Sequence, residues 1–211
     1  MSGHSICLDA ISQLARQQVI LQNENLEDAV ADLTPDSIID FWFSDDVSEK
    51  HFDKDPDFDQ LCRDQFLDSY EAARAGNLPT WNDTPVGMLA LVIILDQFPR
   101  NMFRDTPKAF ETDDMAVQIA ENAIAMGKDQ VLSIDHRKFL FMPFMHSEDL
   151  VVQEHSVARF QTLGLEDNIK YAIAHRDVIA RFGRFPHRNA ILGRESTDAE
   201  REYLAQPGAG F

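Results

Sequence analysis

The chain has 211 residues and a mass of 24.0 kDa, and 44% of its residues are hydrophobic, which is enough to build the core of one domain. Its formal net charge of −17 opposes binding to nucleic acid and to anionic membranes, because both are bound by neutralising phosphates with Lys and Arg. No run of about 18 uncharged apolar residues occurs, so we expect no transmembrane helix. The N-terminus lacks a basic segment followed by an apolar one, so we expect no secretory signal and a cytoplasmic location.

The first 33 residues differ from the rest of the chain. Ile6, Ile11 and Leu14 recur at helical spacing and predict an amphipathic helix at 5–22, followed by a polar connector. We expect residues 1–33 either to dock on the body of the protein or to join two chains as a homodimer. The remainder, 34–211, is predicted to be a single helical domain.

End signals define the helices of this domain. Thr34, Asp55, Thr84 and Thr106 each precede a proline, which is the pattern of an N-cap residue before the first helical position. Thr197 and Glu200 form a capping box, and glycines at 76, 127, 164 and 183 follow helical stretches. Together with the helical period of the apolar residues, these signals predict helices at 35–43, 56–75, 85–98, 107–126, 136–145, 148–163, 167–182 and 198–205.

The order of these elements predicts the fold class. No segment shows the sustained alternation and β-branched enrichment of a strand, so the sequence indicates an all-α protein. Paired helices with short connectors favour a stack of helical hairpins, in a degenerate right-handed tetratricopeptide-like array. The 34-residue period of regular tetratricopeptide repeats is absent from the sequence.

One short phrase occurs twice. Residues 95–101 read Leu-Asp-Gln-Phe-Pro-Arg-Asn and residues 184–189 read Arg-Phe-Pro-His-Arg-Asn, and in both the phrase follows a predicted helix. The second copy lies in a basic island, because five arginines and two histidines stand against two acids between Tyr171 and Glu195. Arginine suits bidentate recognition of a carboxylate or phosphate, whereas cations near the C-terminal end of a helix also stabilise its exposed carbonyls.

Two interpretations of the basic residues therefore stand side by side. In one, they hold an anionic ligand and face a solvated pocket, so that replacing Arg184 or Arg188 by alanine changes stability little. In the other, they cap helix ends and pair with acids. The candidate ligand-binding residues are Arg100, Asn101, Arg104, Arg181, Arg184, His187, Arg188 and Asn189.

Acid–base chemistry has four candidate residues, Asp96, His146, Glu148 and His175. His175 is as well explained by a core position, since it shares a helical face with apolar residues. Glu148 is as well explained by an ordinary helix start after Ser147. His146, Glu148 and His155 match no metal-ligand spacing, and no nucleophile elbow or phosphate-binding glycine loop occurs, so we expect neither a metal nor a cofactor.

Longer motifs link the chain to a known family. It resembles the bacterial family called domain of unknown function 924 from about Ile38 to the C-terminus. The resemblance rests on Trp81-Asn-Asp-Thr-Pro, Leu95-Asp-Gln-Phe-Pro-Arg-Asn, Arg137-Lys-Phe with His146-Ser-Glu, and the segment from His175 to Asn189. It implies an α-helical, tetratricopeptide-like fold and brings no established reaction.

Three functions remain open from the sequence. The first is a cytosolic binding protein for a small anionic molecule or a carboxylate-bearing peptide. The second is a hydrolase or transferase that acts on an anionic substrate with a histidine general base, and the third is a structural protein without a ligand. We expect no nucleic acid and no membrane among its partners.

Overall fold

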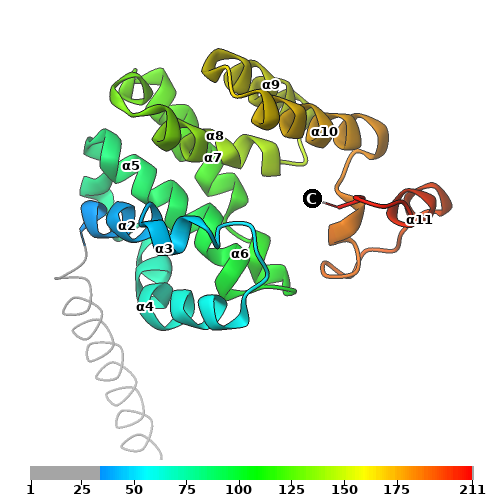
Figure 1. Cartoon of the computed structure of the whole chain (residues 1–211), viewed down its shortest axis with the longest axis horizontal. Coiled ribbons are helices and arrows are strands. Elements are labelled where there is room, and N and C mark those ends of the chain that lie inside the picture. The colour runs from blue at the N-terminus through cyan, green and yellow to red at the C-terminus, as the bar shows by residue number, and fades with distance from the viewer. Residues whose placement is uncertain (1–33, 211) are drawn as a thin grey trace, which may run out of the picture. The chain divides into compact units, whose positions relative to one another are not determined.

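The computed structural model describes residues 34–210. The chain divides into two units, Met1–Thr34 and Pro35–Phe211. All helices of residues 34–210 belong to the second unit. The helix expected at 5–22, and with it the homodimer contact, lies outside the described residues. Between residues 34 and 210 all regular structure is helical and no strand occurs, so the all-α prediction is confirmed (Figure 1).

The second unit contains α-helices joined by short connections and helical turns. Its α-helices are α2 (Pro35–Trp42), α3 (Asp45–Ser48), α4 (Pro56–Arg74), α5 (Pro85–Val92), α6 (Phe98–Met102), α7 (Asp113–Ala125), α8 (Ile134–His146), α9 (Leu150–Leu163), α10 (Glu166–Phe182) and α11 (Asp198–Leu204). A π-helical segment spans Ile93–Gln97, and 3₁₀ turns span Pro79–Asp83, Pro107–Phe110, Lys128–Val131 and Pro186–Arg188.

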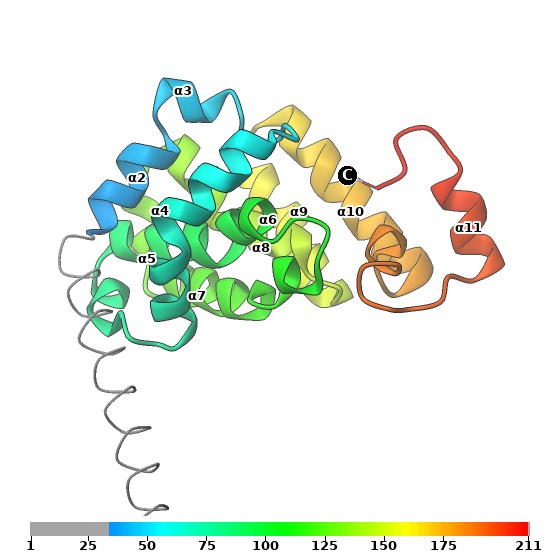
Figure 2. The ribbon, with the colours of Figure 1, turned by 90° about the horizontal axis from the view of Figure 1, so that it is seen from below.

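Neighbouring helices pack on one another in a stack. From α7 to α10 each helix packs on the next, while α2 packs on α5 and α4 packs on α6. α11 stands at one end of the unit, beyond α10, in both ribbon views (Figures 1 and 2). The predicted helical stack is confirmed, and the tetratricopeptide-like character stays a prediction.

Most of the predicted helix starts have the expected chemistry. The Asp55 carboxylate accepts hydrogen bonds from the backbone N–H groups of Asp57 and Phe58, and the Thr84 hydroxyl accepts one from Gly87. Thr197 and Glu200 form the full capping box. Thr106 was expected to start a helix at 107–126, and this prediction is wrong: its hydroxyl donates to the Phe103 carbonyl, a 3₁₀ turn follows, and α7 begins at Asp113.

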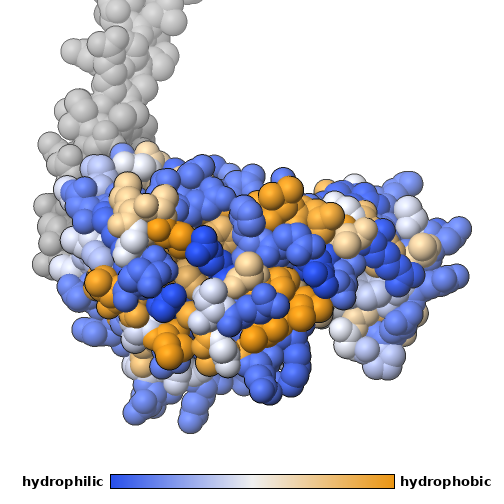
Figure 3. Space-filling model, turned by 90° about the horizontal axis from the view of Figure 1, so that it is seen from above, coloured by the Kyte–Doolittle hydropathy of each residue, from blue (hydrophilic) through white to orange (hydrophobic). Residues whose placement is uncertain are grey.

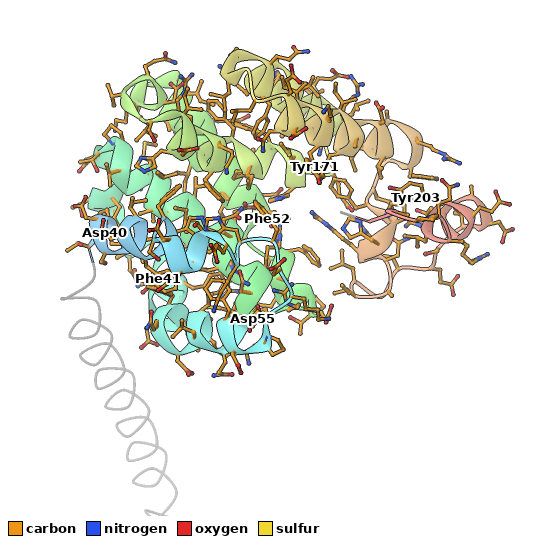
Figure 4. The ribbon with its side chains drawn as sticks, viewed as in Figure 1. Asp40, Phe41, Phe52, Asp55, Tyr171 and Tyr203 are labelled. Carbon is orange, nitrogen blue, oxygen red and sulfur yellow. The ribbon has the colours of Figure 1, made fainter. Side chains whose placement is uncertain are left out.

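Aromatic side chains fill the space between α2, α4 and α6. Figure 4 shows Phe41 on α2, and its ring meets the ring of Phe66 of α4 at 4.6 Å between centroids. Phe66 in turn stacks on Phe98 at 4.5 Å, and Trp42 meets Phe98 edge-on at 5.5 Å. Phe98 is 0% exposed, so the first residue of the Phe-Pro phrase is a core residue.

The predicted helix at 85–98 does not end at Phe98. It continues through a π-helical turn in which the N–H of Phe98 donates to the carbonyl of Ile93, and then through Pro99 to Met102. Proline lacks an N–H, so the carbonyl of Leu95 loses its usual donor four residues on. The hydroxyl of Thr112 supplies a replacement at 2.5 Å. Asp96 lies within this π-helical segment and is 0% exposed.

The surface is mostly hydrophilic. Figure 3 shows one face, on which hydrophobic surface occurs in separate patches between hydrophilic side chains. Within residues 34–210, no helix is both long enough and apolar enough to cross a membrane.

Candidate functional site

A cavity of about 710 Å³ opens on the second unit. Its walls come from the 3₁₀ turn Pro107–Phe110, the first residues of α7, the connection from α8 to α9, and the segment that follows Gly183. Gly183 ends α10 with φ +69°, a left-handed conformation that glycine adopts without strain, and this turn directs the basic segment back toward α7. Residues far apart in the sequence therefore meet around one cavity.

The two copies of the Phe-Pro phrase meet at Asp113. Both guanidinium groups contact the carboxylate of Asp113. Nη2 of Arg100 lies 2.8 Å from Oδ1, and Nη1 of Arg188 lies 3.2 Å from Oδ2. Both guanidinium groups also lie over the ring of Phe110, at 4.9 Å and 4.5 Å from its centroid. Burial raises the pKa of Asp113, and the neighbouring charge of Arg100 opposes that rise.

Arg188 is held between two aromatic rings at the cavity wall. Its guanidinium lies 4.5 Å from the centroid of Phe110 and 4.6 Å from that of Phe185, and the residue is 6% exposed. Its Nε–H is buried and has no hydrogen-bond partner among residues 34–210. Burial, and then the charge of Arg100, lower the pKa of Arg188 to about 10, so the guanidinium remains charged at neutral pH. Arg188 thus lines the cavity without being open to solvent, because Phe110, Phe185 and Asp113 surround its guanidinium.

His146, the last residue of α8, also lines the cavity. Its Nδ1–H donates to Oδ1 of Asp96 at 2.6 Å, and the Asp96 Oδ2 accepts a hydrogen bond from the side-chain amide of Gln97. Burial alone would raise the pKa of Asp96, but the charge and hydrogen bond of His146 hold it below its ordinary value. Asp96 is therefore an ionised carboxylate that fixes the ring of His146.

The two other histidines of the region are kept neutral. His175 is 7% exposed, its Nδ1 lies 2.8 Å from the backbone carbonyl of Tyr171, and burial lowers its pKa to about 3. Its ring meets that of Phe185 edge-on at 5.7 Å, which is the packing of a core residue. Burial, followed by the charge of Arg188, lowers the pKa of His187 to about 4. Neither histidine is suited to accept a proton near neutral pH.

Glu148 fastens the basic segment to the α8–α9 connection. Its carboxylate accepts two hydrogen bonds from Arg194, at 2.7 Å and 2.9 Å, and one from the N–H of Phe185 at 2.7 Å. Burial raises its pKa, but these hydrogen bonds outweigh that effect and the pKa is lowered. Glu148 is thus an anchoring carboxylate, and the start of α9 is capped instead by Asp149, which accepts from Val151 and Val152.

Several predicted ligand-binding residues have other partners. Arg104 and Asn101 both donate to Asp59, and Arg184 donates to both carboxylate oxygens of Glu200. The contact of Arg184 agrees with the interpretation in which the arginines pair with acids. The hydrogen bonds from Arg184 lower the pKa of Glu200.

Two more of the predicted ligand-binding residues, Arg181 and Asn189, contact residues near them in the sequence. Arg181 is exposed and lies over the ring of Phe182 at 4.6 Å, and Asn189 bridges Ser196 and Arg194. Of the eight candidates, the structure brings Arg100, His187 and Arg188 to the same cluster.

Three residues of the site were missed from the sequence. Asp113 joins the two arginines, Phe110 stacks on both, and Lys108 lines the cavity. All three follow Thr106-Pro107, a signal that predicted a helix start and did not indicate a buried carboxylate. Among the described residues no group of three or more His, Cys, Asp or Glu side chains is placed to hold a metal ion, and His155 is exposed on α9.

The fold and the cavity define a class: an all-helical protein with a cavity that combines a half-buried histidine, hydrogen-bonded to a buried aspartate, with two arginines on one buried carboxylate. The family model "Bacterial protein of unknown function (DUF924)" matches residues 38–208, and the chain belongs to this family. It is similar to the solved structure of a protein of unknown function, ATU0120, from Agrobacterium tumefaciens. The two are 44% identical, with a TM-score of 0.77 over 81% of this chain and 96% of that one. A comparison with curated proteins gives no match.

Proposed function

We propose that the protein is a cytosolic binding protein for a small molecule with a carboxylate group, which it holds beside Arg188 and His146. The observation that carries this proposal is the state of Arg188. Arg188 lines the cavity, and the one carboxylate that its guanidinium meets, Asp113, is shared with Arg100. A ligand carboxylate beside Arg188 would add a second negative partner for these two arginines through a charge-assisted hydrogen bond.

The charges around the cavity favour a monoanion. Five carboxylates line it, and three of them have arginine partners: Glu111 with Arg74, Asp113 with Arg100 and Arg188, and Glu148 with Arg194. Asp149 caps α9, and Asp114 remains. The basic residues that line the cavity are Lys108, which pairs with Glu71, Arg188, which pairs with Asp113, and His146. This balance suits a single negative charge placed at the basic side and repels a phosphate dianion, whose second charge would meet the acids.

The size of the cavity agrees with a small ligand. About 710 Å³ lies within the usual range of roughly 300–1,000 Å³ for small-molecule sites. Phe110, Pro107 and Leu192 supply apolar wall beside the charged groups. Such a mixture of apolar wall and a few convergent polar groups is typical of ligand sites.

A titration with succinamate, a monoanion that carries one carboxylate, tests the proposal. Binding is followed by calorimetry and by amide chemical shifts in the full chain, with phosphate as the comparison anion. We expect saturable binding of succinamate with shifts at the cavity, and weaker binding of phosphate. The Arg188→Lys variant keeps the charge but loses the planar fork, and should bind about ten- to a hundredfold more weakly, since a charged hydrogen bond contributes roughly 1.5–3 kcal/mol.

Arg104→Lys is the matched control. Arg104 also follows a Phe-Pro phrase, but its side chain donates to Asp59, so its replacement should leave succinamate affinity unchanged. Equal loss in both variants, or shifts that avoid the cavity, would favour a purely structural role for the arginines.

A further inference from the structure

The geometry around His146 goes beyond binding. In a neutral imidazole one nitrogen carries the proton and the other carries a lone pair. The carboxylate of Asp96 only accepts, so its 2.6 Å hydrogen bond places the proton on Nδ1 and the lone pair on Nε2. The His146 side chain is 19% exposed and lines the cavity, whereas Asp96 is 0% exposed. This is the arrangement of a general base whose ring is oriented by a buried acid.

The backbone is adapted to this pair. Asp96 lies in the π-helical segment Ile93–Gln97, and π-helical turns occur frequently at functional sites. Asp96 also lies 3.5 Å from Arg100, so the positive charge of that arginine supports its ionised state. An ionised Asp96 stabilises the imidazolium that His146 becomes when it takes up a proton.

The surroundings point to water as the nucleophile. Within the described part of the chain, Ser147 is the one hydroxyl residue at the cavity, and its Oγ accepts a hydrogen bond from the N–H of Asp149 at 3.1 Å. The other candidate bases are unsuitable, because Glu148 is engaged by Arg194 and His175 is held neutral in the core.

We infer that the cavity hydrolyses an ester whose acid part carries a second, free carboxylate, with His146 as the general base and Asp96 as its positioning residue. This inference rests on the proposed function, because Arg188 is the group that holds the free carboxylate. Nε2 of His146 takes a proton from a water molecule while the water oxygen bonds to the ester carbonyl carbon. The bond to the leaving oxygen then breaks, and the proton passes from His146 to that oxygen. The products are a dicarboxylic acid and an alcohol.

The test uses the full-length protein and three chromogenic probes. Mono-4-nitrophenyl succinate carries the free carboxylate, 4-nitrophenyl butyrate lacks it, and 4-nitrophenyl phosphate replaces the acyl group by a phosphoryl group. We expect release of 4-nitrophenolate from the succinate ester, much slower release from the butyrate and none from the phosphate. Because general-base catalysis contributes about 10²–10⁴-fold, His146→Gln should lower kcat by at least about 100-fold.

Matched variants separate chemistry from structure. His155→Gln alters an exposed histidine of α9 and should leave the rate unchanged. Arg188→Lys should raise KM for the succinate ester more than it lowers kcat. Asp96→Asn should lower kcat and move the rise of activity with pH to lower pH, which a merely structural role would not do. Circular dichroism checks the fold of each variant. His146→Asn repeats the test of the general base with a second substitution at the same position.

The outcomes distinguish this inference from the proposed function. Succinamate binding without hydrolysis above the His146→Gln level would overturn the catalytic role and leave the binding role intact. Hydrolysis that depends on His146 but not on the free carboxylate would support the base and overturn Arg188 as the anchor. An acylated protein in mass spectra of quenched reactions would overturn water as the nucleophile. Absence of both binding and hydrolysis would overturn both proposals.

Discussion

Replacement of Arg188 by alanine should destabilise the protein substantially. The sequence places Arg188 in a loop after Pro186, and the interpretation in which its side chain faces a solvated pocket predicts little loss of stability. In the structure the residue is 6% exposed, and its guanidinium contacts Asp113, Phe110 and Phe185. The variant therefore removes an ion pair and two cation–aromatic contacts at once.

The contacts set the size of the effect. Breaking a buried ion pair by removing one partner costs roughly 3–5 kcal/mol, chiefly because a charge is left unpaired. Here Arg100 remains 2.8 Å from Asp113, which reduces that cost. Each desolvated cation–aromatic contact adds about 1–2 kcal/mol. Taking the two aromatic contacts at the low end, about 2 kcal/mol together, and about 1 kcal/mol left from the ion pair, we expect a net loss of about 3 kcal/mol in the free energy of unfolding.

Urea unfolding followed by circular dichroism at neutral pH measures this loss. With a slope of about 1–3 kcal/mol per molar urea, the midpoint should fall by about 1–3 M. Arg181→Ala is the control: Arg181 is exposed and contacts the ring of Phe182, so its loss should stay below about 1 kcal/mol. If Arg188→Ala behaves like this control, the guanidinium does not lie between the two rings, and the description of the cavity wall fails.

Three further predictions concern stability. Gly87→Ala should cost about 1–3 kcal/mol in urea unfolding, because an added Cβ would lie 2.2 Å from the carbonyl oxygen of Trp81; an unchanged midpoint would contradict this close approach. Thr112→Val should cost about 1–3 kcal/mol by the same measurement, because the buried Leu95 carbonyl loses its hydroxyl donor, and a cost near zero would argue against that compensation. The pKa of His175 is lowered from 6.5 to about 3 in the folded state, so the unfolded chain binds the extra proton and stability is lost as pH falls below 6.5. Between pH 7 and pH 5 this residue should account for about 2 kcal/mol, and His175→Gln should show a correspondingly smaller loss over the same range.

Local rules predicted much of the fold. The caps at Asp55, Thr84 and Thr197 act through hydrogen bonds to residues two or three positions away, so the sequence contains both partners. The left-handed glycines at 127, 164 and 183 end helices for an equally local reason. The path through Pro99 was missed because its compensation is not local: the donor to Leu95 lies 17 residues further along the chain.

The candidate site shows the same division. The histidines and arginines near the two Phe-Pro phrases indicated where the site lies in the sequence. The partners of these residues depend on tertiary packing. Arg104 finds Asp59 at a separation of 45 residues, and Arg188 finds Asp113 at a separation of 75. The two arginines have similar sequence contexts. Arg104 forms an ion pair with Asp59 away from the cavity, whereas Arg188 pairs with Asp113 at the cavity wall, and only the fold decides which carboxylate lies near each arginine.

The cavity concentrates buried charge in a way that stability alone does not favour. Asp96 and Asp113 are 0% and 7% exposed, and replacing such buried ionic groups by apolar residues of similar volume is often neutral or stabilising. The cluster therefore needs another reason for its position. Asp96 directs the lone pair of His146, and Asp113 holds Arg100 and Arg188 together against their mutual repulsion. Each buried acid thus orients a basic group beside the same cavity, and a preorganised charge of this kind gains its value when a ligand carries the complementary charge.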